Sequence, residues 1–284
     1  MGFHLRALLG LLVFLVVALA LTDYVNAKGH HIQRNGQRVN SRHRDRDGGR
    51  RGHIRQKRHR PKFKPGPWIH AHATFYDGGS ESFGGACGYH DVVKEGYGLE
   101  TVALSEALFK NGQGCGSCYE LKCVDDPKWC KPGKSSLFVT ATNHCPAGGV
   151  CSPPLHHFDI AKPVFSQIAD YTGGIIPVIY RRVPCKKQGG IRFTITGNPY
   201  YNEVLVWNAG GAGDVISLKV KGSKKLKWTE MRRLWGQRWV TEAMMVGESL
   251  TFRVQASDGR YSTAWHVAPK TWQFGQTFEG KNFK

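Results

Sequence analysis

The sequence predicts an all-β protein built from two domains, and three observations lead to that fold class. Short runs rich in β-branched residues, several alternating at period two, are bounded by Gly, Pro or Asn, which is typical of strands in barrels and sandwiches. Helix signals are few and cover only residues 101–110 and 163–171. All 8 cysteines lie between Cys87 and Cys185.

The division into two domains follows the cysteines and the tryptophans. Residues 186–284 carry six of the chain's 8 tryptophans and no cysteine. A polar connector at residues 186–190, ending in two glycines, separates the two compositions. We therefore expect a first domain at residues 67–185 and a second at residues 191–284. The predicted strands span residues 137–142, 176–180, 191–196, 203–207, 215–220 and 249–254.

The chain begins with the pattern of a secretory signal peptide over residues 1–27. Arg6 precedes an uncharged apolar run of about 15 residues, short of the roughly 20 that a membrane-spanning helix needs. Val25 and Ala27 supply the small residues of a cleavage site. The mature protein is therefore expected to be exported to an oxidising compartment, where an even number of cysteines forms disulfides.

Residues 28–66 form a strongly basic extension. They hold 14 lysine and arginine residues against two aspartates, a net charge of +12 out of the chain's +19. Few apolar side chains accompany this charge, so the extension is predicted to be disordered. Three interpretations stay open: a pro-segment cleaved at the dibasic run of residues 55–58, a tether to an acidic polymer, or a solvated tail. Nucleic acid is not an expected partner of an exported chain that has no base-reading element.

An ordered series of short motifs runs through both predicted domains. The first domain contains, in order, His72-Ala-Thr-Phe-Tyr76, Gly84-Gly-Ala-Cys-Gly-Tyr89, Cys115-Gly-Ser-Cys118, Ala141-Thr-Asn-His-Cys145 and His157-Phe-Asp159. The second contains Gly211-Ala-Gly-Asp214, Trp235-Gly-Gln237 and Trp272-Gln-Phe-Gly-Gln276. This series resembles the plant α-expansins, the expansin A family, over essentially everything after Trp68. The long basic extension is not part of the usual pattern of that family.

The resemblance implies a fold and an activity. The fold is a six-stranded double-psi β-barrel like that of family-45 endoglucanases, followed by a β-sandwich carbohydrate-binding module. The activity is loosening of the plant cell wall at acid pH, without hydrolysis, by disrupting non-covalent adhesion between cellulose and matrix glucans.

The resemblance also implies partners and a location. The partners are cellulose and xyloglucan. The charge of the basic extension, and not the resemblance, adds acidic pectin as a further partner. No cofactor is implied, and a monomer is expected. The implied location is extracellular, in the cell wall, with the outer face of the plasma membrane as a second one.

Asp159 is the candidate functional acid of the first domain. It follows His157 and Phe158, and taken alone it also fits a turn aspartate that bonds its own backbone. The resemblance to the endoglucanases gives it the place of the catalytic acid, in a non-hydrolytic role. Thr74, Tyr76 and His157 are the other residues expected at this site.

A glycosidase needs a second carboxylate, about 5 to 10 Å from the first. Asp77 directly follows Tyr76 and is the candidate, which gives an alternative function: a family-45-like endo-β-glucanase using Asp159 with Asp77. The same residue opens the turn-forming run Asp77-Gly-Gly79, and expansins generally lack the base. Other acids in loop-like contexts are Glu81, Asp91 and Glu95.

Aromatic side chains are the candidate polysaccharide-binding residues of the second domain. Neighbours in a strand point to opposite faces, so only one of Tyr200 and Tyr201 can enter the core. Trp235, beside Gly236, is a better surface candidate than Trp239. A flat row of aromatics suits the apolar faces of a β-glucan chain, and the resemblance places that row at Tyr200, Tyr201 and Trp235.

The cysteines are expected to form disulfides rather than a metal site. Cys115 and Cys118 alone could bind a metal, but in an exported chain the disulfide interpretation dominates. Oxidised cysteines cannot bind zinc, so no site is expected with the nearby histidines, which are His144, His156 and His157. The resemblance implies the pairs Cys87–Cys115, Cys118–Cys185 and Cys123–Cys130, which leaves Cys145–Cys151.

Overall fold

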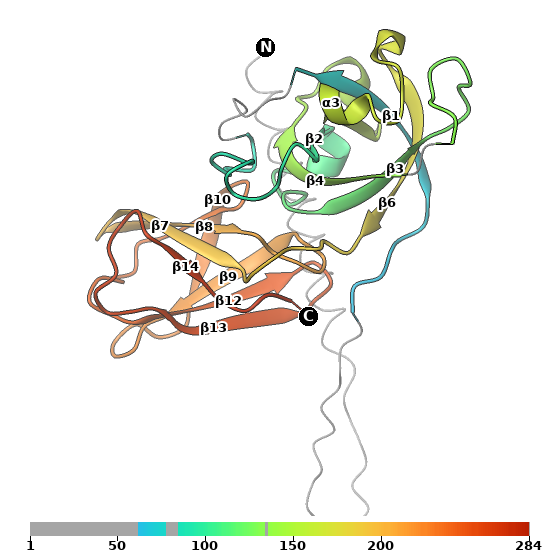
Figure 1. The fold of residues 1–284 in the computed structure, drawn as a ribbon. Coiled ribbons are helices and arrows are strands. Elements are labelled where there is room, and N and C mark those ends of the chain that lie inside the picture. The colour runs from blue at the N-terminus through green and yellow to red at the C-terminus, as the bar shows by residue number, and fades with distance from the viewer. Residues whose placement is uncertain (1–61, 78–84, 134–135, 284) are drawn as a thin grey trace, which may run out of the picture. The chain divides into compact units, whose positions relative to one another are not determined.

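The computed structural model describes residues 62–77, 85–133 and 136–283. It divides the chain into two units, Met1–Lys57 and Arg58–Lys284. The predicted signal peptide and the basic extension up to residue 61 lie outside the described residues, so the fold in Figure 1 is that of the second unit. No helix among the described residues is long and apolar enough to cross a membrane.

The first half of this unit is a closed six-stranded β-barrel (Figure 1). Neighbouring strands follow the order β1-β5-β2-β4-β3-β6, and β6 pairs with β1 to close the barrel. Two of the pairs are parallel, β1 with β5 and β2 with β4. The strands are β1 (Ile69–Tyr76), β2 (Thr101–Leu104), β3 (Cys118–Cys123), β4 (Leu137–His144), β5 (His157–Ala161) and β6 (Ile176–Val183).

The core of the barrel fixes the register of its central strands. Leu104 in β2 and both Phe158 and Ile160 in β5 are fully buried. The Phe158 ring lies 5.2 Å from that of Tyr119 and 4.8 Å from that of Tyr180. A slip of one residue would turn these apolar side chains out of the core, so the positions of the polar residues between them are set as well.

The second half contains eight strands that fold into two layers. Their order is β13-β12-β9-β10-β11-β8-β7-β14. β10 joins the layers, because its first residues pair with β9 and its last with β11. The core between the layers includes Phe193 and Phe252, whose rings stack at 4.7 Å. The strands are β7 (Arg192–Asn198), β8 (Tyr201–Trp207), β9 (Val215–Lys221), β10 (Thr229–Trp235), β11 (Arg238–Thr241), β12 (Leu250–Ala256), β13 (Tyr261–Ala268) and β14 (Thr277–Glu279).

The two predicted helices are wrong in part. Thr101–Leu104 is strand β2, which is buried between β4 and β5, and only Glu106–Phe109 is helical (α2). Pairing with strands distant in the sequence outweighs local propensity here. The helix predicted over residues 163–171 is reduced to α3 (Lys162–Phe165), and the 3-10 turn η2 (Tyr171–Gly173) follows it.

Four disulfides stabilise the barrel half, and no described cysteine is free. They pair the cysteines as the resemblance implies. Cys118–Cys185 closes 67 residues of chain, and in the loop-entropy account a closure of this length stabilises the fold by about 4 kcal/mol. The pairs are Cys87–Cys115, Cys118–Cys185, Cys123–Cys130 and Cys145–Cys151.

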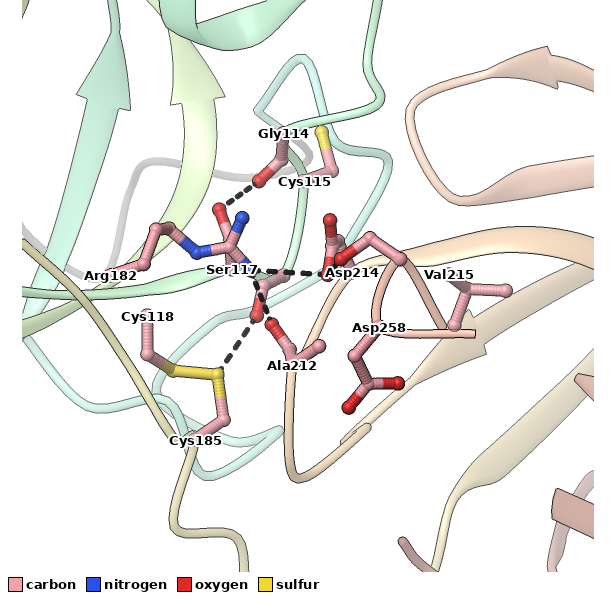
Figure 2. A network of polar contacts seen from close by, with 12 residues as sticks. Gly114, Cys115, Ser117, Cys118, Arg182, Cys185, Ala212, Asp214, Val215 and Asp258 are labelled. Carbon is pink, nitrogen blue, oxygen red and sulfur yellow. Dashed lines mark hydrogen bonds and ion pairs between the residues drawn. A yellow bond between two sulfur atoms is a disulfide. The ribbon is translucent and has the colours of Figure 1, made fainter. Parts of the chain in front are cut away.

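Polar contacts join the barrel to the two-layered half (Figure 2). Arg182 of β6 donates to the backbone oxygen of Ala212 at 2.7 Å and to Asp214 Oδ1 at 3.1 Å. Gly213 has a φ of +81°, and a Cβ there would lie 2.2 Å from the backbone oxygen of Gly116. A larger residue than glycine at position 213 would therefore force the two halves apart.

Candidate functional site

Thr74, His157 and Asp159 form a hydrogen-bonded cluster in the barrel. The parallel register of β1 and β5 sets Thr74 opposite Asp159. Thr74 Oγ1 donates to Asp159 Oδ1 at 2.9 Å and lies 2.8 Å from His157 Nε2. Residues two apart in a strand face the same side, so His157 and Asp159 reach the same hydroxyl group. The structure thus brings together three of the four residues expected at this site.

His157 is neutral near pH 7 and is the first donor of the hydrogen-bond chain. Its side chain is fully buried, and this burial, with a smaller effect of His72, lowers its pKa to about 4. Because the Thr74 hydroxyl gives its proton to Asp159, its oxygen can only accept from His157, which places the imidazole proton on Nε2. His157 Nδ1 has no hydrogen-bond partner among the described residues. The chain of donors therefore runs from His157 through Thr74 to Asp159.

Replacing His157 by Gln should make folding less sensitive to acid. Between pH 6.5 and 4 the imidazole is neutral in the folded protein and protonated once the chain unfolds, so stability is lost as the pH falls through this window. We expect the free energy of unfolding of the wild type to fall by about 3 kcal/mol more than that of the variant between pH 7 and 4. Urea denaturation at several pH values measures this, and parallel slopes for the two proteins would contradict it.

The Asp159 carboxyl group holds its proton more tightly than an exposed aspartate. Burial raises its pKa, and the hydrogen bond from Thr74 offsets part of the rise. The interpretation of Asp159 as a turn residue is wrong, because it lies inside β5 and its side chain bonds to another strand. The site therefore contains a half-buried acid whose pKa lies above that of an exposed aspartate.

Asp159 belongs to a row of residues that crosses four neighbouring strands. Ala103 of β2 lies opposite Asp159 on one side and opposite Asn143 of β4 on the other, so the row is Thr74, Asp159, Ala103 and Asn143. Asn143 Oδ1 accepts from the backbone N–H of Ala86 at 2.8 Å. Asn143 stands in one of the motifs noted in the sequence, but no local pattern indicated that it would lie in this row.

Tyr76, the fourth expected residue, lies at the end of the same strand face. It is two residues beyond Thr74 and opposite Ala161, and it packs partly buried against the barrel core. His156, by contrast, belongs to the other face of the chain and lies 2.9 Å from the Tyr180 hydroxyl. Only one of the two adjacent histidines, His157, contacts the Thr74 hydroxyl.

Asp77 is not placed as a partner of Asp159. Its side chain is 90% exposed, and its ion-pair partner is Lys162 Nζ at 3.8 Å. It lies just beyond the end of β1, three residues after Thr74. The carboxylate that the endoglucanase alternative requires is therefore exposed and paired with Lys162, not with the Thr74 cluster.

The other acids noted in the sequence also have separate roles or fall outside the structure. Asp91 accepts from the backbone of the residues that follow it and pairs with Lys94 at 3.2 Å. Glu95 accepts from His90 at 3.2 Å. Glu81 lies outside the described residues. Among the described carboxylates, Asp159 is the one that hydrogen-bonds to Thr74.

The three predicted polysaccharide-binding residues are exposed. Tyr200 is 76% exposed, Tyr201 37% and Trp235 43%, while Trp239 is buried in the core. Tyr200 lies in the turn before β8 and Tyr201 begins that strand, so neither enters the core. The sequence predicted that at least one of the two tyrosines is exposed, and in the structure both are exposed.

An arginine connects Trp235 to β8 and to the barrel. The Arg238 guanidinium lies 5.3 Å from the Trp235 ring centre, forms an ion pair with Glu203 and donates to His90 Nε2 at 3.1 Å. Glu203 is two residues beyond Tyr201 on the same face of β8. The face that carries Tyr201 and Trp235 therefore reaches the barrel loop at His90. Sequence reasoning missed this bridge, because Arg238 and Glu203 are 35 residues apart.

Within residues 62–77, 85–133 and 136–283, no group of three or more His, Cys, Asp or Glu side chains is placed to hold a metal ion. His144 instead lies 2.7 Å from Glu106 and stacks on Phe109 with ring centroids 4.2 Å apart. These contacts account for one of the histidines that lie near the cysteines in the sequence.

Comparisons with known proteins support a family assignment. Residues 191–269 match the model of the expansin C-terminal domain, and residues 101–180 match a model described as lytic transglycolase. Expansin-A32 of Oryza sativa subsp. japonica is 57% identical over 80% of this chain and 88% of its own length. Expansin-A22 of Arabidopsis thaliana is 49% identical over 75% of this chain and 78% of its own.

Solved structures show the same fold. The crystal structure of the Clavibacter michiganensis expansin matches with a TM-score of 0.61 at 19% identity, over 76% of this chain and 97% of that one. A mutant of the same protein in complex with cellohexaose matches with a TM-score of 0.59, also at 19% identity, over 75% of this chain and 96% of that one. A closed barrel followed by a β-sandwich is thus the expansin class of architecture. The chain belongs to the plant α-expansins, the expansin A family, which are secreted cell-wall-loosening proteins.

Proposed function

We propose that this chain loosens the plant cell wall without hydrolysis, by breaking non-covalent adhesion between cellulose and matrix glucans such as xyloglucan at acid pH. Asp159 is the functional acid, Thr74 and His157 form a hydrogen-bonded cluster with it, and Tyr76 lies further along the same face of β1. The observation that carries the proposal is a hydrogen-bond chain from His157 through Thr74 to one half-buried carboxyl group. Burial raises the pKa of that group, which suits a response to acid.

The placement of the carboxylates argues against hydrolysis. A glycosidase uses one carboxyl group as the acid and a second, about 5 to 10 Å away, as the base or nucleophile. Asp159 can supply the first function. Asp77 is exposed and pairs with Lys162, so it is not held in place for the second function, and Glu81 lies outside the described residues. The alternative, an endo-β-glucanase using Asp159 with Asp77, would require the Asp77 carboxylate to leave Lys162 and turn toward Asp159.

A protonated carboxyl group supplies the chemistry that wall loosening needs. It donates a hydrogen bond to a glycan oxygen, whereas the ionised form can only accept. Glycan chains adhere partly through hydrogen bonds between hydroxyl groups, and a donor held in a fixed position competes with these bonds. Activity should therefore rise as the pH falls toward the pKa of Asp159. His157, with a pKa of about 4, stays mostly neutral until the pH falls to near 4.

Tyr200, Tyr201 and Trp235 are proposed to bind a β-glucan chain, which in the wall is cellulose. Sugar rings have apolar C–H faces, and exposed aromatic rings bury these faces with little demand for hydrogen bonds. All three side chains are exposed, and Arg238 links Trp235 to the barrel loop at His90. The bacterial expansin mutant solved in complex with cellohexaose supports a glucan as the ligand.

The remaining expectations concern the whole protein. The proposed domains are residues 67–185 and 191–284, joined by the linker at residues 186–190. The proposed state is an extracellular monomer in the cell wall, with the plasma-membrane face as a second location. Acidic pectin is the proposed partner of the basic extension, whose residues up to 61 lie outside the described part of the chain.

Replacing Thr74 by Val should shift the acid dependence of wall creep to higher pH. Valine keeps the branched shape but removes the hydroxyl that donates to Asp159, which is the contact that lowers the pKa of this carboxyl group. Loss of one hydrogen bond to a charged group corresponds to a rise of about one pH unit. The measurement is the rate of creep of heat-inactivated walls under constant load between pH 4 and 7.

Thr74→Ser is the matched control, because it keeps the hydroxyl and should keep the wild-type midpoint. A wild-type profile that is flat from pH 4 to 7 would contradict the proposed function itself. If the wild type responds to acid and Thr74→Val has the same midpoint pH, Thr74 does not tune the pKa of Asp159.

A further inference from the structure

The turn between β9 and β10 concentrates lysine residues on one surface. Residues 219–228 read Lys-Val-Lys-Gly-Ser-Lys-Lys-Leu-Lys-Trp, and the last three lysines of this run are exposed. Arg253 lies on the neighbouring strand β12. These cations and one tryptophan form a surface that we term the basic platform. It consists of Lys221, Lys224, Lys225, Lys227, Trp228 and Arg253.

A buried carboxylate holds this turn in shape. Glu248 accepts from the backbone N–H groups of Lys224 at 2.5 Å, Lys225 at 2.7 Å and Leu226 at 3.3 Å. These backbone hydrogen bonds, that of Lys225 most of all, lower the pKa of Glu248 to about 2. Position 222 must be glycine, since a Cβ there would lie 2.5 Å from Glu248 Oε2. The Glu248 carboxylate is thus occupied by hydrogen bonds from the backbone. Because it stays ionised above about pH 2, these bonds hold the shape of the turn over the whole pH range of a plant wall.

Trp228 lies among the cations of the platform. Its ring centre is 4.3 Å from the Arg253 guanidinium carbon and 6.0 Å from Lys221 Nζ. The Trp265 ring meets it edge-on at 6.1 Å. Arg253 Nε also donates to Thr263 Oγ1 at 3.2 Å, which holds the guanidinium in position. Cation–π contacts of this kind keep a flat ring and positive charges on one surface.

Within the described part of the chain the cations of the platform form no ion pairs, and the ionised Glu248 carboxylate hydrogen-bonds to the backbone of the turn instead. None of its four lysines, nor Arg253, forms an ion pair with a described acidic residue. The nearby Lys219 differs, because it pairs with Glu230 at 3.1 Å. Five positive charges on one surface repel each other, and an anionic ligand would relieve that repulsion.

We propose that the basic platform is a second glycan site, which binds an acidic polysaccharide composed of uronic acid residues. Trp228 offers a ring to the C–H face of one sugar, and the surrounding ammonium groups meet the carboxylates that recur along such a chain. The Arg253 guanidinium can bind one carboxylate through two parallel hydrogen bonds. The site is independent of the acid at Asp159 and of neutral glucan binding.

A polysaccharide fits the platform better than an anionic membrane does. A surface that enters a bilayer presents exposed apolar side chains beside its lysines. The aliphatic residue of this turn is Leu226, and it packs against the core of the two-layered half. The platform therefore offers charge and the aromatic rings of Trp228 and its neighbour Trp265, without an aliphatic side chain to insert.

The platform is also separate from the aromatic residues proposed to bind neutral glucan. Trp228 precedes β10, whereas Trp235 is the last residue of that seven-residue strand. An extended strand of this length spans about 20 Å. One chain could therefore contact a neutral and an acidic polysaccharide at the same time, through different surfaces.

The test is lysine footprinting on the full mature chain. Acetylation rates of individual lysines are read by mass spectrometry in the presence of hexagalacturonate, cellohexaose or vesicles containing 30% phosphatidylserine. We expect hexagalacturonate to slow acetylation of Lys221, Lys224, Lys225 and Lys227 by about fivefold or more. Cellohexaose and vesicles should slow it by less than twofold. Added salt at 0.5 M should abolish the protection, since exposed charges are then strongly screened.

A double substitution tests Trp228 and Arg253, the two members of the basic platform that are not lysines. The four lysines stay in place, so their acetylation still reports binding. In Trp228→Ala with Arg253→Gln, the hexagalacturonate concentration for half-protection should rise about tenfold. The matched control is Tyr171→Ala with Lys270→Gln, which removes an exposed aromatic and an exposed cation elsewhere. It should change the hexagalacturonate concentration for half-protection by less than twofold.

Three results of the wild-type footprint would overturn the proposal. Protection confined to lysines of the basic extension would show that the extension alone holds the anion. Equal protection at Lys270 would show non-specific attraction by net charge. Protection by the vesicles, without protection by hexagalacturonate, would show that the platform is a membrane surface.

Discussion

Replacing Asp159 by Asn should reduce the acid-induced creep of isolated walls by about tenfold or more, and the remaining creep should no longer depend on pH between 4 and 6. An amide cannot gain or lose a proton in this range, and its N–H is a weaker donor than a carboxyl O–H. Loss of one strong hydrogen bond in the rate-determining state corresponds to about 1.4 kcal/mol, or tenfold. The shape of the site should survive, because the Asn oxygen can still accept from Thr74 Oγ1. Creep under constant load gives the rate.

Asp77→Asn is the matched control, because it makes the same chemical change at an exposed carboxylate. It should leave both the rate and the pH profile of creep within a factor of two of the wild type. Equal losses in the two variants would favour the endoglucanase alternative, in which both carboxylates act. Undiminished creep in Asp159→Asn would remove this residue from the mechanism.

The second large effect is expected from the exposed aromatic residues. Substituting Tyr200, Tyr201 and Trp235 together by Ala should weaken binding to crystalline cellulose by about a hundredfold. Each ring can bury apolar surface worth about 1 kcal/mol against a sugar face, and three such contacts give about 3 kcal/mol. Binding isotherms on cellulose measure the change. Because the ligand is uncharged, the affinity of the wild type should hardly change between low and high salt.

A control must show that the effect depends on position rather than on lost aromatic surface. Tyr171 and Trp265 are 47% and 59% exposed and lie on other elements, so Tyr171→Ala with Trp265→Ala should keep cellulose binding within a factor of two. A triple variant that binds cellulose like the wild type would show that glucan recognition lies elsewhere in the chain.

Local sequence patterns predict much of the second half. The run at residues 215–220 lies within β9 and the run at residues 203–207 within β8. Alternation at period two is a property of neighbouring residues, so it can be found without knowing the pairing partner. The choice between Trp235 and Trp239 also depended on local cues, the glycine beside Trp235 above all, and the structure has Trp235 exposed and Trp239 buried.

The elements that sequence reasoning missed depend on residues far apart in the chain. β2 reads locally as the start of a helix, and it becomes a strand because β4 and β5 pair with it from both sides. Glu203 and Arg238 meet across 35 residues. Glu248 holds a turn that lies 22 to 24 residues before it in the sequence. None of these contacts leaves a periodic signal.

The disulfide pairing illustrates a different limit. Eight cysteines allow 105 sets of four pairs, and spacing alone does not choose among them. The resemblance to a family implied one set, and the structure contains it. The acid site is similar: Thr74 and Asp159 are 85 residues apart, and their contact follows from the parallel pairing of β1 with β5.

The central claim is that a single half-buried acid loosens the wall without cutting glucan. The most direct measurement records extension and the release of reducing ends from the same heat-inactivated wall strip, at pH 4.5, with the full mature chain. We predict rapid extension with reducing ends no higher than in strips treated with heat-denatured protein. Reducing ends that rise in proportion to extension, and that disappear in both Asp159→Asn and Asp77→Asn, would contradict the account and identify the chain as a hydrolase.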